Sequence, residues 1–245
     1  MRQHRQRRGR GGNEGGVAVS DDVISALRTF TTPSISNGIE TFKVRGRHEG
    51  FMDASIRCVF PGMGRMVGYA ATAKIRATSP GNRLPASDLW KHVLSVASPR
   101  VVVVQDLDDP PGVGALWGEV NGNIHRALGC VGIVTNGSVR DLDEVEALGF
   151  QFFAASIGVS HAYVRIVEVG TPVTLGGLTV RPGDILHGDK HGVISIPQEI
   201  AAELPDAVRR IEAEERRTIE YCQRPDFSPE GLIAPGQGAD REVQH

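Results

Sequence analysis

Apolar and polar positions over the first hundred residues predict two short helices, a strand and a third helix. Ser20, followed by two acidic residues and an apolar rhythm, is typical of a helix N-cap. Thr32-Pro33 is expected to end that helix, and a second one is predicted over residues 34–42. The small and apolar residues 66–77 predict a strand, and a helix should follow from Ser87 to about Ala97.

The middle of the chain alternates strands with helices. The continuous β-branched run 101–104 predicts a strand that is buried on both faces. An acidic, proline-containing loop over 106–112 should follow, and then a helix from Gly118 that ends at Gly129. The next predicted elements are a strand over 131–135, a turn at 136–138, a helix over 142–148 and a strand over 150–157.

The pattern changes after residue 163 to several short strands, with turns expected at 176–177, at 182–183 and at Gly188. A charged helix is predicted over 198–222. We therefore expect one domain of the mixed α/β (α+β) class, with a mixed sheet, flanking helices and a C-terminal helix. Its predicted range is 17–225, between a basic tail over 1–16 and a C-terminal tail over 226–245.

Composition supports a folded protein of the reducing cytoplasm. Forty per cent of the 245 residues are hydrophobic and the net charge is −2, which allows a substantial core. No apolar run reaches the roughly 18 residues that span a bilayer, and no signal-peptide segment follows Met1. Cys58, Cys130 and Cys222 are far apart and odd in number, which argues against a disulfide scaffold or a cysteine zinc site.

The positive charge is concentrated at the N-terminus. Five arginines and Glu14 give residues 1–16 a net charge of +4, so the rest of the chain carries −6. This segment cannot bury apolar surface, and we expect it to be disordered and solvated, although it could touch an acidic surface or nucleic acid. An acidic body with one short basic tail argues against a nucleic-acid-binding protein and against a membrane partner.

Residues 112–141 hold the densest candidate chemistry. Gly112, Gly114 and Gly118 are spaced G-x-G-x-x-x-G, one residue longer than the dinucleotide-binding pattern, and the acidic loop before them would repel a pyrophosphate. A different interpretation makes 118–121 the first turn of a helix, whose unpaired N–H groups attract a carboxylate or enolate oxygen. Gly118 could equally serve only to fit a helix against a sheet.

Arg140 and Asp141 follow a predicted buried strand, where ligand sites of α/β proteins gather. An arginine can bind a carboxylate through two parallel N–H bonds, and an aspartate is the hard ligand that Mg²⁺ prefers. The alternative is structural: Asp141 caps the following helix, and Arg140 forms a surface salt bridge.

Together these segments resemble the RraA-like family. The matching residues are Gly118-Glu119 and the run Gly129-x-x-Gly132-Ile133-Val134-x-Asn136-Gly137-x-Val139-Arg140-Asp141. The later run Pro182-Gly183-Asp184-Ile185-x-x-Gly188-Asp189-x-x-Gly192-Val193 is also similar, and the resemblance spans about residues 20 to 220. The family includes the 4-hydroxy-4-methyl-2-oxoglutarate aldolases, which also decarboxylate oxaloacetate.

The resemblance assigns roles residue by residue. It implies that Gly118, Glu119, Val120 and Asn121 bind substrate through their backbone, that Arg140 binds a substrate carboxylate and that Asp141 binds Mg²⁺ or Mn²⁺. The family often has aspartate where Glu119 stands. It also implies a glutamate from a neighbouring subunit's C-terminal helix, for which we choose Glu215 ahead of Glu212 and Glu214, in a homotrimer or homohexamer with sites between subunits.

Other catalytic arrangements fit less well. His187 and His191 are four residues apart, but Gly188 and the expected turn deny them a shared helix face for zinc. A Schiff-base aldolase needs a lysine in an apolar pocket, and Lys74 alone lies in an apolar strand, where it could simply point to water. No G-x-S-x-G motif of serine hydrolases is present.

Two functions remain open at this point. The first is a metal-dependent aldolase or decarboxylase that cleaves a short 2-oxo dicarboxylate through a pyruvate enolate, with Arg140 and Asp141 as central groups and a water near Glu119 as base. The second is a non-catalytic regulator that binds a protein such as a ribonuclease, as some relatives in the family do.

Overall fold

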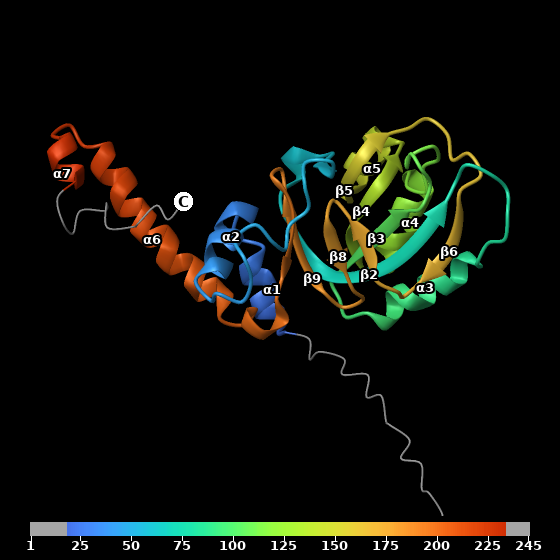
Figure 1. Cartoon of the computed structure of the whole chain (residues 1–245), viewed down its shortest axis with the longest axis horizontal. Helices are drawn as coiled ribbons and strands as arrows, with labels where there is room; N and C mark the ends of the chain where they lie inside the picture. The colour runs from blue at the N-terminus through green and yellow to red at the C-terminus, as the bar shows by residue number, and fades with distance from the viewer. Residues whose placement is uncertain (1–18, 234–245) are drawn as a thin grey trace, which may run out of the picture.

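The computed structural model describes residues 19–233, so the predicted basic tail over 1–16 lies outside the described residues (Figure 1). The α-helices within this range are α1 (Asp21–Leu27), α2 (Thr32–Glu40), α3 (Ala86–Ser95), α4 (Glu119–Ala127), α5 (Leu142–Leu148), α6 (Leu204–Cys222) and α7 (Pro229–Ile233). Two 3₁₀ turns, η1 (Pro61–Met63) and η2 (Gln198–Ile200), complete the helical elements. None of these helices is both long and apolar enough to cross a membrane.

A mixed eight-stranded sheet forms the centre, in the order β1-β5-β4-β3-β2-β9-β10, with β6 also paired to β2. Strands β2, β3, β4 and β5 run parallel to one another, whereas β1, β6, β9 and β10 pair antiparallel with their neighbours. The strands are β1 (Arg57–Cys58), β2 (Met66–Arg76), β3 (Arg100–Asp106), β4 (Cys130–Val139), β5 (Gln151–Ile157), β6 (Arg165–Val169), β9 (Ile185–Asp189) and β10 (Gly192–Ile196). A separate hairpin joins β7 (Val173–Leu175) to β8 (Leu178–Val180). The mixed α/β prediction is confirmed.

The sheet is buried on both faces, which explains the β-branched run of β3. Val102 and Val104 pack in the cluster beneath helices α1 to α5, and Val101 and Val103 pack on the other face beneath the β7–β8 hairpin. All four side chains are fully buried. Side chains alternate across a strand, so a run without polar residues is what a strand with two covered faces requires.

Three sequence predictions are corrected by the structure. Helix α2 begins at Thr32 rather than at 34, because Pro33 lies in its first turn, where no N–H is needed, and the Thr31 hydroxyl accepts a hydrogen bond from Ser34 N–H. The turn expected at 136–138 is wrong, since β4 continues to Val139 with a bulge in its pairing with β5. Gly188 lies inside β9, and the turn comes after Asp189.

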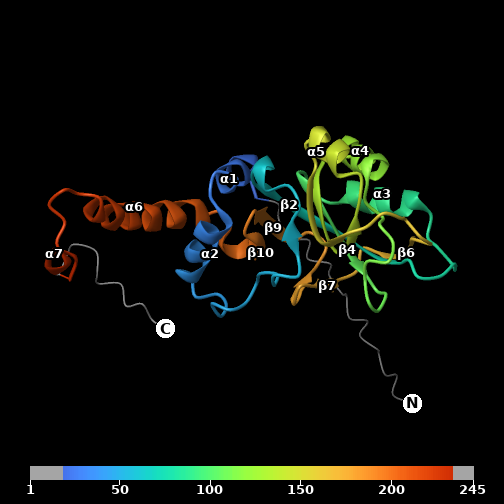
Figure 2. The ribbon, with the colours of Figure 1, turned by 90° about the horizontal axis from the view of Figure 1, so that it is seen from above.

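The long helix α6 projects from the body of the molecule (Figures 1 and 2). Its buried residues all lie in its first half and end at Ile211, where it packs on α1 and α2. The second half and α7 extend away from the sheet, on the side opposite α4 and α5. Helix α7 lies within the segment for which only a loose tail was expected.

Candidate functional site

The two predicted parts of the site meet where β4 ends. The backbone of Trp117 pairs in parallel with Val139, and Arg140 N–H donates to the Trp117 carbonyl oxygen at 3.0 Å. Residue 117 directly precedes Gly118, the N-cap of α4, and residue 139 directly precedes Arg140. The structure therefore holds the start of α4 beside the Arg140–Asp141 pair, although 22 residues separate Glu119 from Asp141 along the chain.

Asp141 adopts a backbone conformation that aims its carboxylate at α4. Its φ of 55° and ψ of 50° are left-handed, which is rare for a residue other than glycine and costs about 1–3 kcal/mol. Although it occupies the N-cap position of α5, its side chain makes no capping bond to that helix. Instead Oδ2 accepts the backbone N–H of Glu119 at 3.0 Å. The carboxylate thus caps a helix that is distant in sequence.

Gly118 permits this approach because it lacks a side chain. A Cβ at position 118 would collide with Asp141 Oδ2 and would lie 3.1 Å from Arg140 Cγ. The φ of Gly118 is −165°, an extended value open to any residue, so the requirement is for space rather than for an unusual backbone. The group that comes close to Gly118 in this structure is the carboxylate of Asp141.

Arg140 lies beside the carboxylate and keeps part of its guanidinium accessible. Its Nε is 3.7 Å from Asp141 Oδ2, and each of the two side chains is 36% exposed. A half-exposed pair at this separation contributes little to stability. The remaining N–H groups of Arg140 donate to no acceptor among residues 19–233, so they can bind an anion that arrives from solvent.

The first turn of α4 offers fewer open amides than expected. The N–H of Glu119 is already used by Asp141, whereas the N–H groups of Val120 and Asn121 have no acceptor among the described residues. The Asn121 side chain donates to the Leu116 carbonyl oxygen at 2.6 Å and fixes the turn. The Glu119 side chain is exposed. Two backbone donors and the positive end of the helix dipole therefore remain for a ligand.

Asp141 is suited to a divalent cation that retains most of its water. Both of its contacts use Oδ2, and Oδ1 accepts no hydrogen bond from the part of the chain that the structure describes. Among those residues, no group of three His, Cys, Asp or Glu side chains could enclose a metal. A single accessible carboxylate oxygen fits Mg²⁺ or Mn²⁺, which bind through one or two carboxylates, and does not fit a zinc cage.

The glutamates of α6 are not brought to this site within one chain. Asn37 donates to Glu215 Oε1 at 3.4 Å, and α6 lies on the other side of the molecule from α4 and α5 (Figures 1 and 2). Glu212 and Glu214 lie on the same helix, after its last buried residue, Ile211. Any of them could reach Asp141 only in a second copy of the chain, so their assignment stays a prediction.

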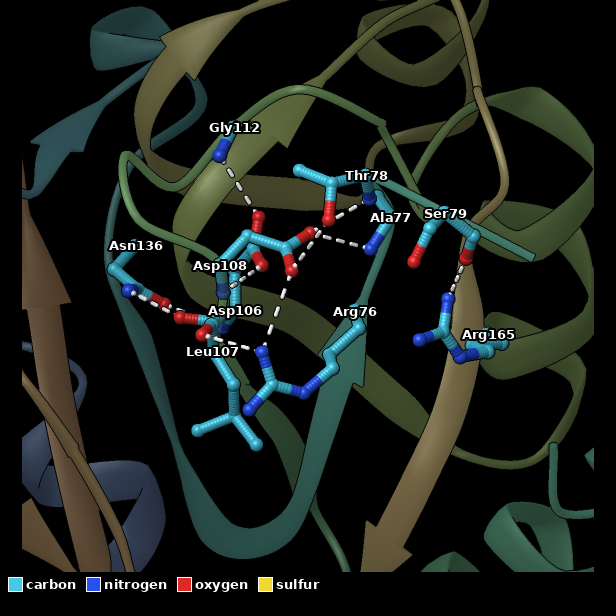
Figure 3. A network of polar contacts seen from close by, with 10 residues as sticks. All are labelled: Arg76, Ala77, Thr78, Ser79, Asp106, Leu107, Asp108, Gly112, Asn136 and Arg165. Atoms are coloured by element: carbon cyan, nitrogen blue, oxygen red, sulfur yellow. Dashed lines mark hydrogen bonds and ion pairs between the residues drawn. The ribbon is translucent and has the colours of Figure 1, made fainter. Parts of the chain in front are cut away.

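Two buried aspartates shape the loop that leads to α4, and sequence reasoning missed their role (Figure 3). Asp108 Oδ2 accepts the N–H groups of Ala77 and Thr78 at 2.5 and 2.9 Å, and Arg76 Nη1 is 3.5 Å from Oδ1. Burial would raise the pKa of Asp108, but these hydrogen bonds and the charge of Arg76 outweigh it and keep the pKa below its ordinary value.

The second aspartate, Asp106, is buried and accepts backbone N–H groups of the same loop. Its Oδ1 accepts Asp108 N–H at 3.0 Å and its Oδ2 accepts Gly112 N–H at 2.8 Å. Burial raises the pKa of this carboxyl. The acidic loop therefore turns two of its charges inward, and the amide of Gly112 that a pyrophosphate would need is occupied. A dinucleotide site at this loop is not supported.

Asn136 explains why β4 continues where a turn was expected (Figure 3). Its side-chain Oδ1 accepts Asp106 N–H at 2.7 Å, and its Nδ2 donates to the Asp106 carbonyl oxygen at 3.0 Å. The side-chain amide thus takes the place of a backbone partner at the end of β3. The strand bulges here and continues to Val139, which directs Arg140 and Asp141 toward α4.

The other candidate groups are structural. His187 is fully buried, with Nδ1 3.0 Å from Thr32 Oγ1 and Nε2 3.2 Å from the Phe30 carbonyl oxygen. His191 pairs with Asp189 at 3.0 Å and does not share a metal site with His187. Lys74 Nζ forms an ion pair with Glu168 Oε2 at 2.9 Å, so it points neither to an apolar pocket nor freely to water.

Comparison with known proteins identifies a family match that covers most of the described chain. Residues 19–195 match the RraA-like family, described as Aldolase/RraA. A protein of Halalkalibacterium halodurans with the provisional name 4-hydroxy-4-methyl-2-oxoglutarate aldolase is 28% identical over 183 residues, which cover 72% of this chain and 77% of that protein. An uncharacterised protein of Methanocaldococcus jannaschii is 28% identical over 158 residues, 64% of this chain and 73% of that protein.

Solved structures share the fold. An uncharacterised protein of Pseudomonas syringae is 26% identical with a TM-score of 0.67, over 84% of this chain and 90% of that one. The Streptomyces coelicolor protein RraAS2, described as an unusual member of the RNase ES inhibitor RraA family, is 18% identical with a TM-score of 0.68. That match covers 82% of this chain and 98% of RraAS2.

Proposed function

Because this chain belongs to the RraA-like family, we propose that it is a divalent-metal-dependent carbon–carbon lyase acting on a short 2-oxo dicarboxylate. The reaction is retro-aldol cleavage of a 4-hydroxy-4-methyl-2-oxoglutarate type of substrate, decarboxylation of oxaloacetate, or both. The observation that carries the proposal is the 3.0 Å hydrogen bond from Glu119 N–H to Asp141 Oδ2. It places a hard carboxylate ligand, a partly exposed guanidinium and a helix N-terminus around one point.

In this proposal Arg140 binds the substrate carboxylate next to the 2-oxo group. The guanidinium can hold both carboxylate oxygens, which fixes the orientation of the bond to be broken. The N–H groups of Val120 and Asn121 hold a second oxygen, and they do so at the positive end of α4. These donors are rigid before substrate arrives, because Asp141 and Asn121 already fix the turn.

Asp141 would hold Mg²⁺ or Mn²⁺ through its accessible oxygen. The cation supplies Lewis-acid stabilisation of the negative charge that develops on the 2-oxo oxygen. Glu119, exposed in the first turn of α4, would hold a water that accepts the proton of a 4-hydroxyl group. The ion pair of Lys74 with Glu168 does not favour a Schiff-base route.

The proposal includes assembly into a homotrimer or homohexamer with sites between subunits. The support is that α6 projects from the body and carries Glu215 away from its own Asp141. In an oligomer this half of α6 could place Glu215, or else Glu212 or Glu214, beside Asp141 of another copy.

The direct test measures pyruvate release from oxaloacetate and from 4-hydroxy-4-methyl-2-oxoglutarate, with coupled detection of pyruvate. We expect turnover with Mg²⁺ or Mn²⁺ and its loss in excess EDTA, restored by adding metal back. Undiminished turnover in EDTA contradicts the metal dependence. A covalent lysine adduct formed with pyruvate and borohydride would assign the chemistry to Lys74 instead.

The second candidate is a non-catalytic regulator that binds a ribonuclease. It is supported by the shared fold with RraAS2, whose name refers to an RNase ES inhibitor family. Absence of pyruvate release with every substrate and metal, together with saturable binding to a ribonuclease, would favour it over the lyase.

A further inference from the structure

A basic cavity lies at the opposite end of the parallel strands from Asp141. Its volume is about 280 Å³, and its walls come from the first residues of β2, β4 and β5 and from the ends of α1 and α4. Because β2 to β5 are parallel, Asp141 lies beyond their carboxyl ends and this cavity lies at their amino ends. The two places share α4, which begins at the first and ends at the second.

Three arginines line the cavity, and none of them has an acidic partner in the part of the chain that the structure describes. Arg28, Arg65 and Arg126 form no ion pair and no side-chain hydrogen bond among residues 19–233. No aspartate or glutamate is among the residues that line the cavity. The three arginines are exposed, and their like charges around one hollow repel each other; an anion bound between them would offset this repulsion.

The negative ends of two helices offset only part of the positive charge of these arginines. Arg126 lies in the last turn of α4 and Arg28 is the C-cap of α1, and each helix end carries about half a negative charge. Three full positive charges therefore leave a net charge of about +2. In addition, Arg100 Nη1 already donates to the Leu128 carbonyl oxygen at 2.9 Å, so the end of α4 has a cation of its own.

The rest of the cavity is neutral. Burial raises the pKa of the Cys130 thiol to about 12, so this side chain carries no charge at neutral pH. The Gln151 amide is already satisfied, since Nε2 donates to Phe60 O at 3.1 Å and Oε1 accepts Phe152 N–H at 3.0 Å. Gly149, which also lines the cavity, ends α5 with a left-handed φ of 71°.

We propose that this cavity binds a compact polyanion that carries two or more phosphate or carboxylate groups. Guanidiniums bind both groups through paired N–H bonds, and three of them suit a ligand with several anionic oxygens. The volume accommodates a molecule of the size of pyrophosphate or citrate. The site is independent of the proposed lyase reaction, because none of its residues belongs to the Asp141 site.

The test is calorimetric titration of the full chain with inorganic pyrophosphate and, separately, with citrate, at constant ionic strength and without divalent metal. We expect one anion per chain, bound more weakly as salt increases. The Arg126→Gln and Arg65→Gln variants should each weaken binding at least tenfold, because each removes a charge-assisted contact. Arg217→Gln, on the projecting half of α6, removes the same charge elsewhere and should change the Kd less than twofold.

The Arg140→Ala variant distinguishes anion binding in this cavity from ligand binding at the Asp141 site. Binding should persist in Arg140→Ala, because that arginine lies at the other end of the parallel strands. Binding lost in Arg140→Ala, equal losses in Arg217→Gln and Arg126→Gln, or no saturable binding of either anion would each overturn the proposal. Stronger binding of pyrophosphate would assign the site to phosphates, and stronger binding of citrate to carboxylates.

Discussion

The carboxylate of Asp141 caps a helix that begins 22 residues earlier, through a 3.0 Å hydrogen bond from Glu119 N–H to Oδ2. Gly118 offers no side chain for this purpose, so α4 depends on Asp141 for its first turn. The structural and functional interpretations of Asp141 are therefore compatible. One oxygen stabilises the helix, and the other is accessible to a ligand.

The two oxygens of Asp141 can be tested separately. Asp141→Asn keeps an acceptor for Glu119 N–H but loses the charge, so it should fold with nearly wild-type stability and bind Mg²⁺ at least tenfold more weakly. Asp141→Ala also loses the cap, at a cost of about 1 kcal/mol. Both should recover part of their activity at high Mg²⁺. Metal titration and thermal unfolding measure the two effects.

Arg140→Ala is the matched variant for substrate binding. Loss of a charge-assisted carboxylate contact costs about 1.5–3 kcal/mol, so kcat/KM should fall at least tenfold. High Mg²⁺ should not restore it, because Asp141 is intact. If Asp141→Asn binds metal normally, or if Arg140→Ala responds to Mg²⁺ like the Asp141 variants, the pair is only a cap and a surface salt bridge.

Gly118→Ala should damage the site without unfolding the domain. Its new Cβ would collide with Asp141 Oδ2, and the carboxylate must move away from Glu119 N–H. We expect at least a tenfold loss of metal affinity or of kcat/KM. Gly122→Ala is the control on the same helix, because its Cβ would only touch Leu148 Cδ2 at 3.4 Å and alanine favours a helix. Equal effects of the two changes would contradict the close-approach explanation.

Asn136→Ala should weaken both the fold and the site. It leaves the N–H and carbonyl oxygen of Asp106 without their partner at the end of β3, which costs about 1–3 kcal/mol. Chemical denaturation measures this loss, and KM for the substrate should rise because β4 loses the bulge that directs Arg140. Asn82→Ala, at an exposed loop position, should change neither quantity.

His187 should make stability depend on pH in the acid range. Burial lowers its pKa from 6.5 to about 4, so the unfolded chain binds a proton that the folded chain excludes between these values. The free energy of unfolding should fall as pH drops below 6.5, by up to about 1.4 kcal/mol per pH unit and by about 3 kcal/mol in total near pH 4. Denaturant titrations from pH 7 to 4 measure this slope.

His187→Asn removes the titrating group and should flatten the slope over that window, even though the variant is less stable at pH 7. His48→Asn, whose side chain is 88% exposed, should keep the wild-type slope. An unchanged slope in His187→Asn would show that the acid sensitivity lies elsewhere.

The sequence predicts the fold well where local signals agree with tertiary packing. The Ser20 cap, the buried run of β3 and the helix over 142–148 all occur as expected, because capping and side-chain alternation are local properties. The sequence also places Gly118 and Arg140 at the ends of elements. It cannot show that Asp141 points back to α4, since this depends on a left-handed backbone and on contacts between distant residues.

The errors come from side chains that replace backbone partners. Asn136-Gly137 has the composition of a turn, but Asn136 pairs with Asp106 and the strand continues. Asp106 and Asp108 look like exposed loop charges, but backbone N–H groups pair with them in the interior. Two aspartates spaced two residues apart at the end of a buried strand, with a glycine six residues after the first, are the signal that could have revealed this arrangement.

Because Trp117 pairs with Val139, residues 107–116 can change in sequence without displacing the residues around Asp141. Residues 107–116 leave the sheet after β3 and return to it at Trp117, so both ends are held by the sheet itself. Pro111 and Val113 are exposed on this loop, so substitutions there can change its surface without moving Gly118 or Arg140. New side chains at these positions can therefore contact a ligand while the backbone that holds Gly118 beside Arg140 stays unchanged.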